Sequence, residues 1–146
     1  MQTTHPWFWE GNISKTIAAW LEKDQWRILH IADTESHEHG PDVEALKDHQ
    51  RLLIESKGYP LEVYQSGPKQ GLPKRTNPSN QARHWYAQAL LGSLLTLNKY
   101  PDALVAIALP AFPVYENLLQ RTSAHIRKLG INIYLVYEKS DPTQYL

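Results

Sequence analysis

Two short segments carry residues whose types and spacing suit metal-assisted chemistry. The first is Gly40-Pro41-Asp42, and the second is Glu55-Ser56-Lys57, which follows the apolar run 52–54. Residues two apart on a strand point to the same side, so Glu55 and Lys57 should share one face. If 42–46 and 51–57 pair as a hairpin through the turn at 47–50, Asp42 comes up beside Glu55. Two carboxylates and one ammonium group would then converge.

Such a pair of carboxylates suits Mg²⁺, a hard ion that keeps several waters and takes one or two protein carboxylates. A bound metal stabilises the charge that develops on a phosphoryl oxygen. Lys57 would hold or activate the attacking water. The chemistry that these residue types indicate is phosphodiester hydrolysis.

The elements that must position these residues follow from the spacing of apolar side chains. Apolar residues three and four apart predict helices at 10–23, 79–98 and 114–129, the last ended by Gly130. Runs of β-branched, aromatic or continuously apolar residues predict strands at 25–32, 42–46, 51–57, 103–109 and 131–137. Residues 58–80 read as a long loop with a short extra strand at 61–64. This order predicts an α/β fold, with a mixed sheet covered by helices on both faces, in one domain spanning residues 1–146.

Both the motif and the order of elements resemble the restriction-endonuclease-like nucleases with the PD-(D/E)xK signature. The signature here is Pro41-Asp42 followed by Glu55-Ser56-Lys57, and the helix, three strands, helix and strand of that family correspond to residues of about 9–110. The resemblance implies a three-layer fold with a C-terminal helix and strand at 111–146. It also implies a Mg²⁺-dependent DNA endonuclease, with Mn²⁺ as a substitute metal, Asp42 and Glu55 as metal ligands and Lys57 as a catalytic residue.

Two further residues join the expected site through branches of that family. In the Mrr-like and Holliday-junction-resolvase-like branches, which this chain resembles most, a glutamate early in the first helix reaches the metal, and Glu10 matches that place. The alternative is that Glu10 only stabilises the start of the helix through its dipole. The run 81–85, Gln-Ala-Arg-His-Trp, resembles the helix motif of RecB-like nucleases, with Trp85 where tyrosine is usual. By that match Gln81 faces the active site; the alternative is an exposed polar residue in the first turn.

Charge is distributed unevenly along a chain whose formal net charge is zero. Residues 1–62 hold six Lys/Arg and eleven Asp/Glu, whereas residues 63–101 hold five Lys/Arg and no acid. Basic side chains on a loop beside a metal site can neutralise DNA phosphates without reading sequence. We therefore expect phosphate contacts from Lys69, Lys74, Arg75, Arg83 and His84, the alternative being a solvated loop. Tyr59 and Trp85 are candidates for contact with bases.

Other acidic and imidazole groups are alternative candidates for metal binding. Glu44 lies on the same strand face as Asp42, and Asp33 ends the preceding strand, so either could join or support the metal site. His37-Glu38-His39 invites a zinc site, but zinc usually needs three or four spaced protein ligands, and a solvated loop is the favoured interpretation. The absence of cysteine excludes disulfides, thiolate metal sites and cysteine nucleophiles.

Several function classes are disfavoured. There is no apolar run long enough to span a bilayer and no signal-peptide pattern, so the expectation is a soluble, cytoplasmic protein with no membrane partner. A nucleotide-handling enzyme ranks lowest because there is no glycine-rich phosphate loop. The main alternative to a nuclease is a DNA-binding or complex-forming module that keeps the fold without the chemistry. A homodimer is possible, since cutting both strands of a duplex often uses two copies of a site.

Overall fold

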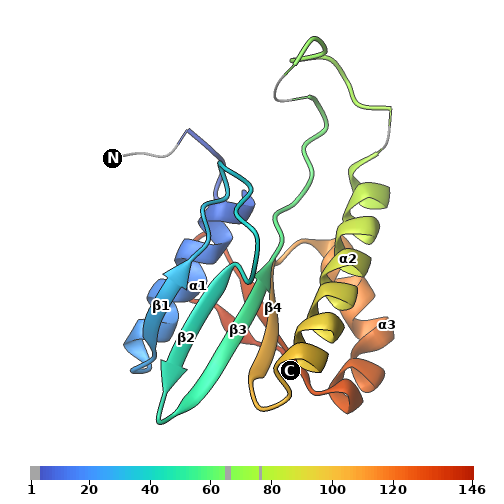
Figure 1. Ribbon diagram of the computed structural model, residues 1–146. Coiled ribbons are helices and arrows are strands. Elements are labelled where there is room, and N and C mark those ends of the chain that lie inside the picture. Colours follow the sequence, from blue (N-terminus) through green and yellow to red (C-terminus); the bar gives the residue numbers. More distant parts are fainter. Residues whose placement is uncertain (1–3, 65–66, 76) are drawn as a thin grey trace.

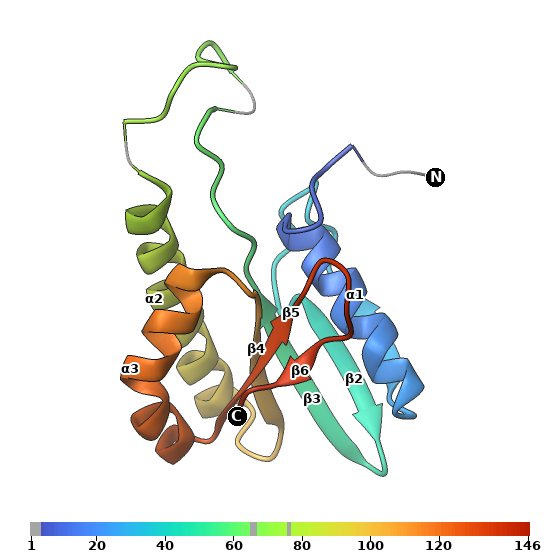
Figure 2. The same ribbon diagram turned by 180° about the vertical axis from the view of Figure 1, so that it is seen from behind.

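A mixed sheet of six strands lies between one helix on one face and two helices on the other in the computed structural model (Figures 1 and 2). The structure describes residues 4–64, 67–75 and 77–146. The chain runs α1 (Glu10–Lys23), β1 (Arg27–Ile31), β2 (Val43–Lys47), β3 (Gln50–Ser56), α2 (Pro78–Lys99), β4 (Leu104–Pro110), α3 (Pro113–Leu129), β5 (Ile131–Val136) and β6 (Thr143–Gln144). The predicted three-layer α/β architecture is confirmed.

Strand order in the sheet follows the sequence from β1 to β6. The first three strands are antiparallel neighbours, β3, β4 and β5 are parallel, and β6 returns antiparallel to β5. The β2–β3 hairpin turns through Asp48 and His49, whose φ angles are 50° and 67°. Two successive residues with positive φ match the twist of the flanking strands, which is why so short a loop can connect them. The register pairs Val43 with Ile54.

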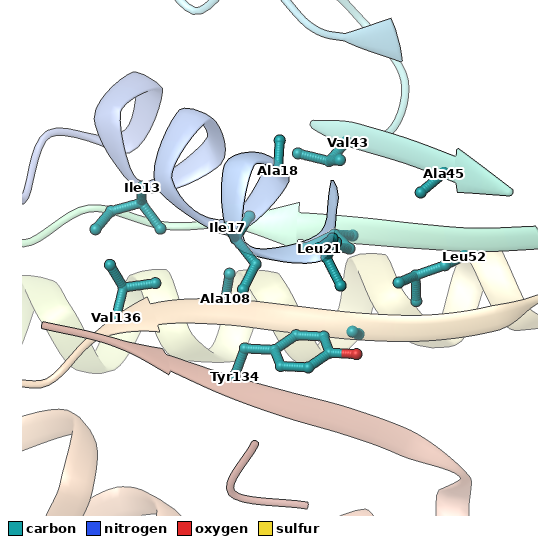
Figure 3. Close-up of a cluster of buried hydrophobic side chains, with 12 residues drawn as sticks. Ile13, Ile17, Ala18, Leu21, Val43, Ala45, Leu52, Ala108, Tyr134 and Val136 are labelled. Carbon is teal, nitrogen blue, oxygen red and sulfur yellow. The ribbon is translucent and has the colours of Figure 1, made fainter. Parts of the chain in front are cut away.

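The sheet separates two hydrophobic clusters. On one face, residues of α1 pack on alternate positions of the strands (Figure 3). On the other face, α2 and α3 pack on the intervening positions of β4 and β5. Strand β4 shows the alternation most clearly, because Ala106 and Ala108 face α1 whereas Ile107 and Leu109 face the other two helices. All four are fully buried, as expected for a strand covered on both sides.

The helix ends follow local signals. Asn77 caps α2, accepting a hydrogen bond from the Asn80 N–H at 2.8 Å, and Pro78 follows it in the first turn. Gly130 ends α3 with φ of 77°, in the left-handed region that glycine adopts without cost. Each expected helix is therefore present, within one residue of its predicted ends.

One expected strand is wrong, and one strand of the structure was not predicted. The extra strand at 61–64 is wrong, because the described part of that loop forms only a single bridge between Val63 and Pro73. The Tyr64 N–H donates to the Leu72 carbonyl and the Lys74 N–H to the Glu62 carbonyl, but Pro73 has no N–H to donate, so this pairing does not extend into a strand. The two-residue strand β6 was not predicted, because its segment contains no apolar run. No helix in the described part of the chain is both long and apolar enough to cross a membrane.

Candidate active site

Asp42 stands immediately before β2, held on both sides by neighbouring strands. Its backbone N–H donates to the Ile54 carbonyl at 2.9 Å, and its own carbonyl accepts from the Ala32 N–H at 2.8 Å. The side chain turns across the hairpin, where Oδ2 accepts a hydrogen bond from the Ser56 N–H at 2.8 Å. One oxygen of this carboxylate is thus bound to β3, and Oδ1 is left for another partner.

Glu55 and Lys57 share a face at the end of β3, as the strand period predicts. The Lys57 Nζ lies 3.8 Å from Glu55 Oε1, and both side chains are more than two-thirds buried. The Lys57 N–H donates to the Ala108 carbonyl at 3.1 Å, which extends the pairing with β4 by one residue and fixes the direction of the chain. Behind Glu55 lies Gly92 of α2, where an added Cβ would be 3.7 Å from the carboxylate carbon.

Glu10 reaches the same region because α1 begins against Gly58. A Cβ on Gly58 would lie 2.5 Å from the Phe8 carbonyl oxygen and 2.8 Å from the Glu10 nitrogen, so only glycine allows this approach. The contact is secured by the Tyr59 N–H, which donates to the Phe8 carbonyl at 3.1 Å. The Tyr115 hydroxyl donates to the Gly58 carbonyl at 2.7 Å. The start of α1 is therefore tied to the residue that follows Lys57.

The side chains of the candidate active site interact electrostatically, and they are Glu10, Asp42, Glu55 and Lys57. Burial raises the pKa of Glu10 to about 7, with the charge of Asp42 adding to the effect and that of Lys57 opposing it. Burial also raises the pKa of Glu55 to about 7, again with a contribution from Asp42. The pKa of Asp42 is raised by burial, against the lowering effects of the Ser56 hydrogen bond and of Lys57. Among the described residues, one lysine lies beside these three carboxyls, so the site holds more acidic than basic groups.

The residues present fit a hard divalent cation held largely by water. Within the described residues, no three His, Asp or Glu side chains already form a metal-binding cluster. Mg²⁺ does not require one, because it commonly keeps several waters and uses one or two carboxylates. Asp42 and Glu55, with Glu10 beside them, supply oxygen ligands of the right kind. A cation would also offset both causes of the raised pKa values of the two glutamates, which are first their burial and second the charge of Asp42.

Gln81 lies in the first turn of α2, and its relation to this site stays a prediction. Its Oε1 is buried and accepts no hydrogen bond within the described structure. Eleven residues separate it from Gly92, which places the two on nearly the same side of the helix and about 16 Å apart along its axis. Gln81 therefore lies on the face of α2 that also carries Gly92, about three turns before the point where that helix meets Glu55.

The predicted phosphate-binding residues lie beyond one end of the sheet. Lys69, Lys74 and Arg75 are on the long loop, which rises from the end of β3 and returns to the start of α2, and Arg83 and His84 follow on that helix (Figure 1). The Lys69 Nζ lies 5.7 Å from the centre of the Tyr64 ring. Arg83 and His84 are exposed. Their contact with phosphates remains a prediction.

The rival acids have other partners. Arg51 binds Glu44, its Nη2 lying 3.0 Å and its Nε 3.2 Å from Glu44 Oε1. Asp33 Oδ1 accepts from the Glu35 N–H at 3.2 Å and so stabilises a turn. In the His37-Glu38-His39 motif, the Glu38 carboxylate pairs with His30 of β1.

Some residues that pack against the candidate active site could not be predicted from the sequence. Tyr115 and Gly92 come from distant helices, and nothing in their local pattern marks them. Tyr59, a predicted base contact, stacks on Phe112 with ring centres 4.0 Å apart, and Phe112 also contacts Trp7 and Phe8. This aromatic cluster joins the N-terminal segment, the residues after β3 and the start of α3. The repeated aromatics at 7–9 were the one visible hint of it.

Comparison with solved structures bears on the fold. A crystal structure of an XisH family protein from Nostoc punctiforme PCC 73102 matches 86% of this chain and 90% of its own, with a TM-score of 0.50 and 15% sequence identity. This chain shares the fold of that XisH family protein. At so low an identity the likeness to the XisH protein concerns architecture alone. No protein-family model and no curated protein matches the sequence.

Proposed function

We propose that this protein is a Mg²⁺-dependent phosphodiester hydrolase of the restriction-endonuclease-like kind, acting on DNA as an endonuclease. The observation that carries the proposal is that Glu10 of α1, Asp42 just before β2 and Glu55 of β3 are largely buried and interact electrostatically, with the Lys57 Nζ 3.8 Å from Glu55. Burying several acids together destabilises a protein unless something compensates. A divalent cation bound to the acids would compensate for their burial, and the cation together with Lys57 would attract an anionic substrate. The resemblance to PD-(D/E)xK nucleases in motif and element order points the same way.

The proposed roles follow from position. Asp42 and Glu55 would hold the metal, with Glu10 as a third acid that binds it directly or through water. Bound Mg²⁺ would supply the positive charge that offsets the charge developing on a non-bridging phosphoryl oxygen. The Lys57 ammonium would orient the water that attacks phosphorus as the bond to the leaving oxygen breaks. The basic residues of the long loop would hold the DNA backbone through charge.

The test is cleavage of plasmid and oligonucleotide DNA in Mg²⁺ or Mn²⁺ by the wild type, Asp42→Asn and Lys57→Ala. Each variant should lose cleavage by at least a hundredfold while keeping its circular dichroism spectrum. Glu44→Gln is the matched control, because Glu44 lies on the adjacent strand but is paired with Arg51. It should cleave at close to the wild-type rate.

Calorimetric titration with Mg²⁺ and Mn²⁺ distinguishes a nuclease from a module that keeps the fold without chemistry. Wild type should bind the metal and Asp42→Asn should bind it at least tenfold more weakly. Undiminished cleavage by both Asp42→Asn and Lys57→Ala would overturn the assignment. DNA binding with neither metal binding nor cleavage would instead support the non-catalytic module.

A further inference from the structure

A groove lies between α1 and the loop that joins β5 to β6. Figure 2 shows this loop beside α1, on the face of the sheet opposite to α2. The groove is open and has a volume of about 660 Å³. Residues of both α1 and the 137–142 loop line it. None of the four residues of the candidate active site lines this groove, so it is a separate feature of the surface.

Three aromatic rings and three lysines line the groove. The residues that define this character are Trp7, Lys15, Trp20, Lys23, Tyr137 and Lys139. Asn12, Thr16 and Ser140 add uncharged hydrogen-bonding groups. Rings that bases can stack on, together with cations that can meet phosphates, are the combination used to bind single-stranded nucleic acid.

The rings are held in place by the hydrophobic core. Trp20 meets Tyr134 edge to face, with ring centres 5.7 Å apart, and Trp7 stacks on Phe112 at 5.7 Å. Both tryptophans are partly buried against the cluster beneath α1. Because their positions are already fixed, little side-chain entropy would be lost when a base packs on them.

The charge of the groove is positive but not uniformly so. Lys23 lies 4.0 Å from Asp141, and Glu138 also lines the groove. Lys15 and Lys139 have no carboxylate within ion-pair distance in the described part of the chain. Those two ammonium groups are therefore free to neutralise phosphates.

One end of the groove approaches the candidate active site. Trp7, which lines the groove, stacks on Phe112, and Phe112 stacks on Tyr59. Tyr59 follows Lys57 by two residues. The aromatic cluster thus forms a bridge between the end of β3 and the groove.

We propose that this groove binds single-stranded DNA, with bases on Trp7, Trp20 and Tyr137 and phosphates on Lys15 and Lys139. The choice of DNA rests on the proposed function, and the choice of a single strand rests on the rings. Bases in a duplex are stacked on each other and leave no face for a protein ring. An unpaired strand beside the cleavage point could pass over the aromatic cluster and enter the groove.

The test measures binding of a fluorescein-labelled 20-nucleotide oligo(dT) by anisotropy, in EDTA, with Asp42→Asn as the parent. The double substitution Lys15→Ala and Lys139→Ala should weaken binding by about tenfold. It should also reduce the slope of log affinity against log salt by about 0.7 for each phosphate that the protein no longer neutralises. Arg121→Ala with Lys128→Ala, two exposed basic residues of α3, is the control with the same change in net charge and should leave affinity within twofold.

A blunt duplex of the same length measures preference, and we expect the lysine pair to affect it less than the single strand. Binding of oligo(dT) that is unchanged by Lys15→Ala with Lys139→Ala, or weakened equally by the α3 control, would overturn the proposal. So would absence of measurable oligo(dT) binding by the parent. The readout needs no metal and no cleavage, so it can succeed or fail independently of the nuclease activity.

Discussion

Replacing Glu55 with glutamine should abolish cleavage and yet stabilise the metal-free protein at alkaline pH. Burial, with a contribution from Asp42, raises the pKa of Glu55 from 4.5 to about 7. Such a group binds its proton more tightly in the folded than in the unfolded chain. Its contribution to stability is therefore complete below the unfolded pKa and is lost as the pH rises through about 7. Glutamine keeps the shape and never takes up the charge.

The size of the effect follows from the pKa. One pH unit corresponds to about 1.4 kcal/mol, so the shift sets an upper limit of about 3 kcal/mol. The Glu55 side chain is 28% exposed and titrates together with its neighbours, which reduces the expected gain to about 1–2 kcal/mol at pH 8. For a chain of this length that corresponds to an increase in Tm of about 3–6 °C. At pH 5, which is only slightly above the ordinary pKa of 4.5, the difference between Glu55→Gln and wild type should fall to about 0.5 kcal/mol or less.

Thermal and urea unfolding in EDTA at pH 5 and pH 8 measure this difference. Glu22→Gln, at an exposed position of α1, is the control and should change stability by less than about 0.5 kcal/mol at either pH. Adding MgCl₂ at pH 8 should raise the Tm of the wild type more than that of Glu55→Gln. If folded Glu55→Gln is no more stable than wild type at pH 8, the idea that repulsion and burial strain this site is wrong.

Four further substitutions test how the site and the helices around it are held together. Gly58→Ala should lower the free energy of unfolding by about 2–3 kcal/mol, because its Cβ would overlap the Phe8 oxygen at 2.5 Å; in Gly92→Ala the Cβ meets Glu55 at 3.7 Å, so urea unfolding should show no loss of stability. Tyr115→Phe removes the bond to the Gly58 carbonyl and should cost about 1–3 kcal/mol in the same assay, together with part of the cleavage rate. Gly130→Ala imposes a side chain at φ of 77° and should lower stability by about 1 kcal/mol without affecting cleavage at saturating DNA. A smaller loss of stability for Gly58→Ala than for Gly130→Ala would contradict the close packing of α1 against Gly58.

The sequence predicted those parts of the fold in which a local pattern matches the final environment. The α1 boundaries were predicted because the apolar stripe of that helix, including Ile13, Ile17 and Leu21, is the face that packs on the sheet. The uninterrupted apolar run of β4 reflects burial on two sides. By contrast, β6 is held by pairing with β5 through residues that show no strand pattern of their own. The predicted strand at 61–64 was wrong because this segment pairs only briefly with 72–74, where Pro73 has no N–H to continue the ladder.

The site was predictable only as far as neighbouring strands determine it. The proximity of Asp42 and Glu55 follows from one hairpin and its register, both of which can be read from the sequence. Glu10 was placed by resemblance, and the physical reason for its position is a contact between Phe8 and Gly58 that no local pattern reveals. Tyr115, which secures that contact, is 57 residues away from Gly58. Long-range packing of this kind leaves no periodic signal in either segment.

The distinction between Asp42 and Glu44 shows why neighbours matter more than spacing. Asp42 stands immediately before β2 and Glu44 lies two residues later on that strand, so by sequence either could hold a cation. Arg51 of β3 already neutralises Glu44 through two of its nitrogens, so a metal would have to displace an existing ion pair. Asp42 has one backbone hydrogen bond and two nearby glutamates whose pKa values are raised. Because a cation gains most free energy where negative charge is least compensated, we expect Asp42 to be the stronger metal ligand, although the two residues fit the strand pattern equally well.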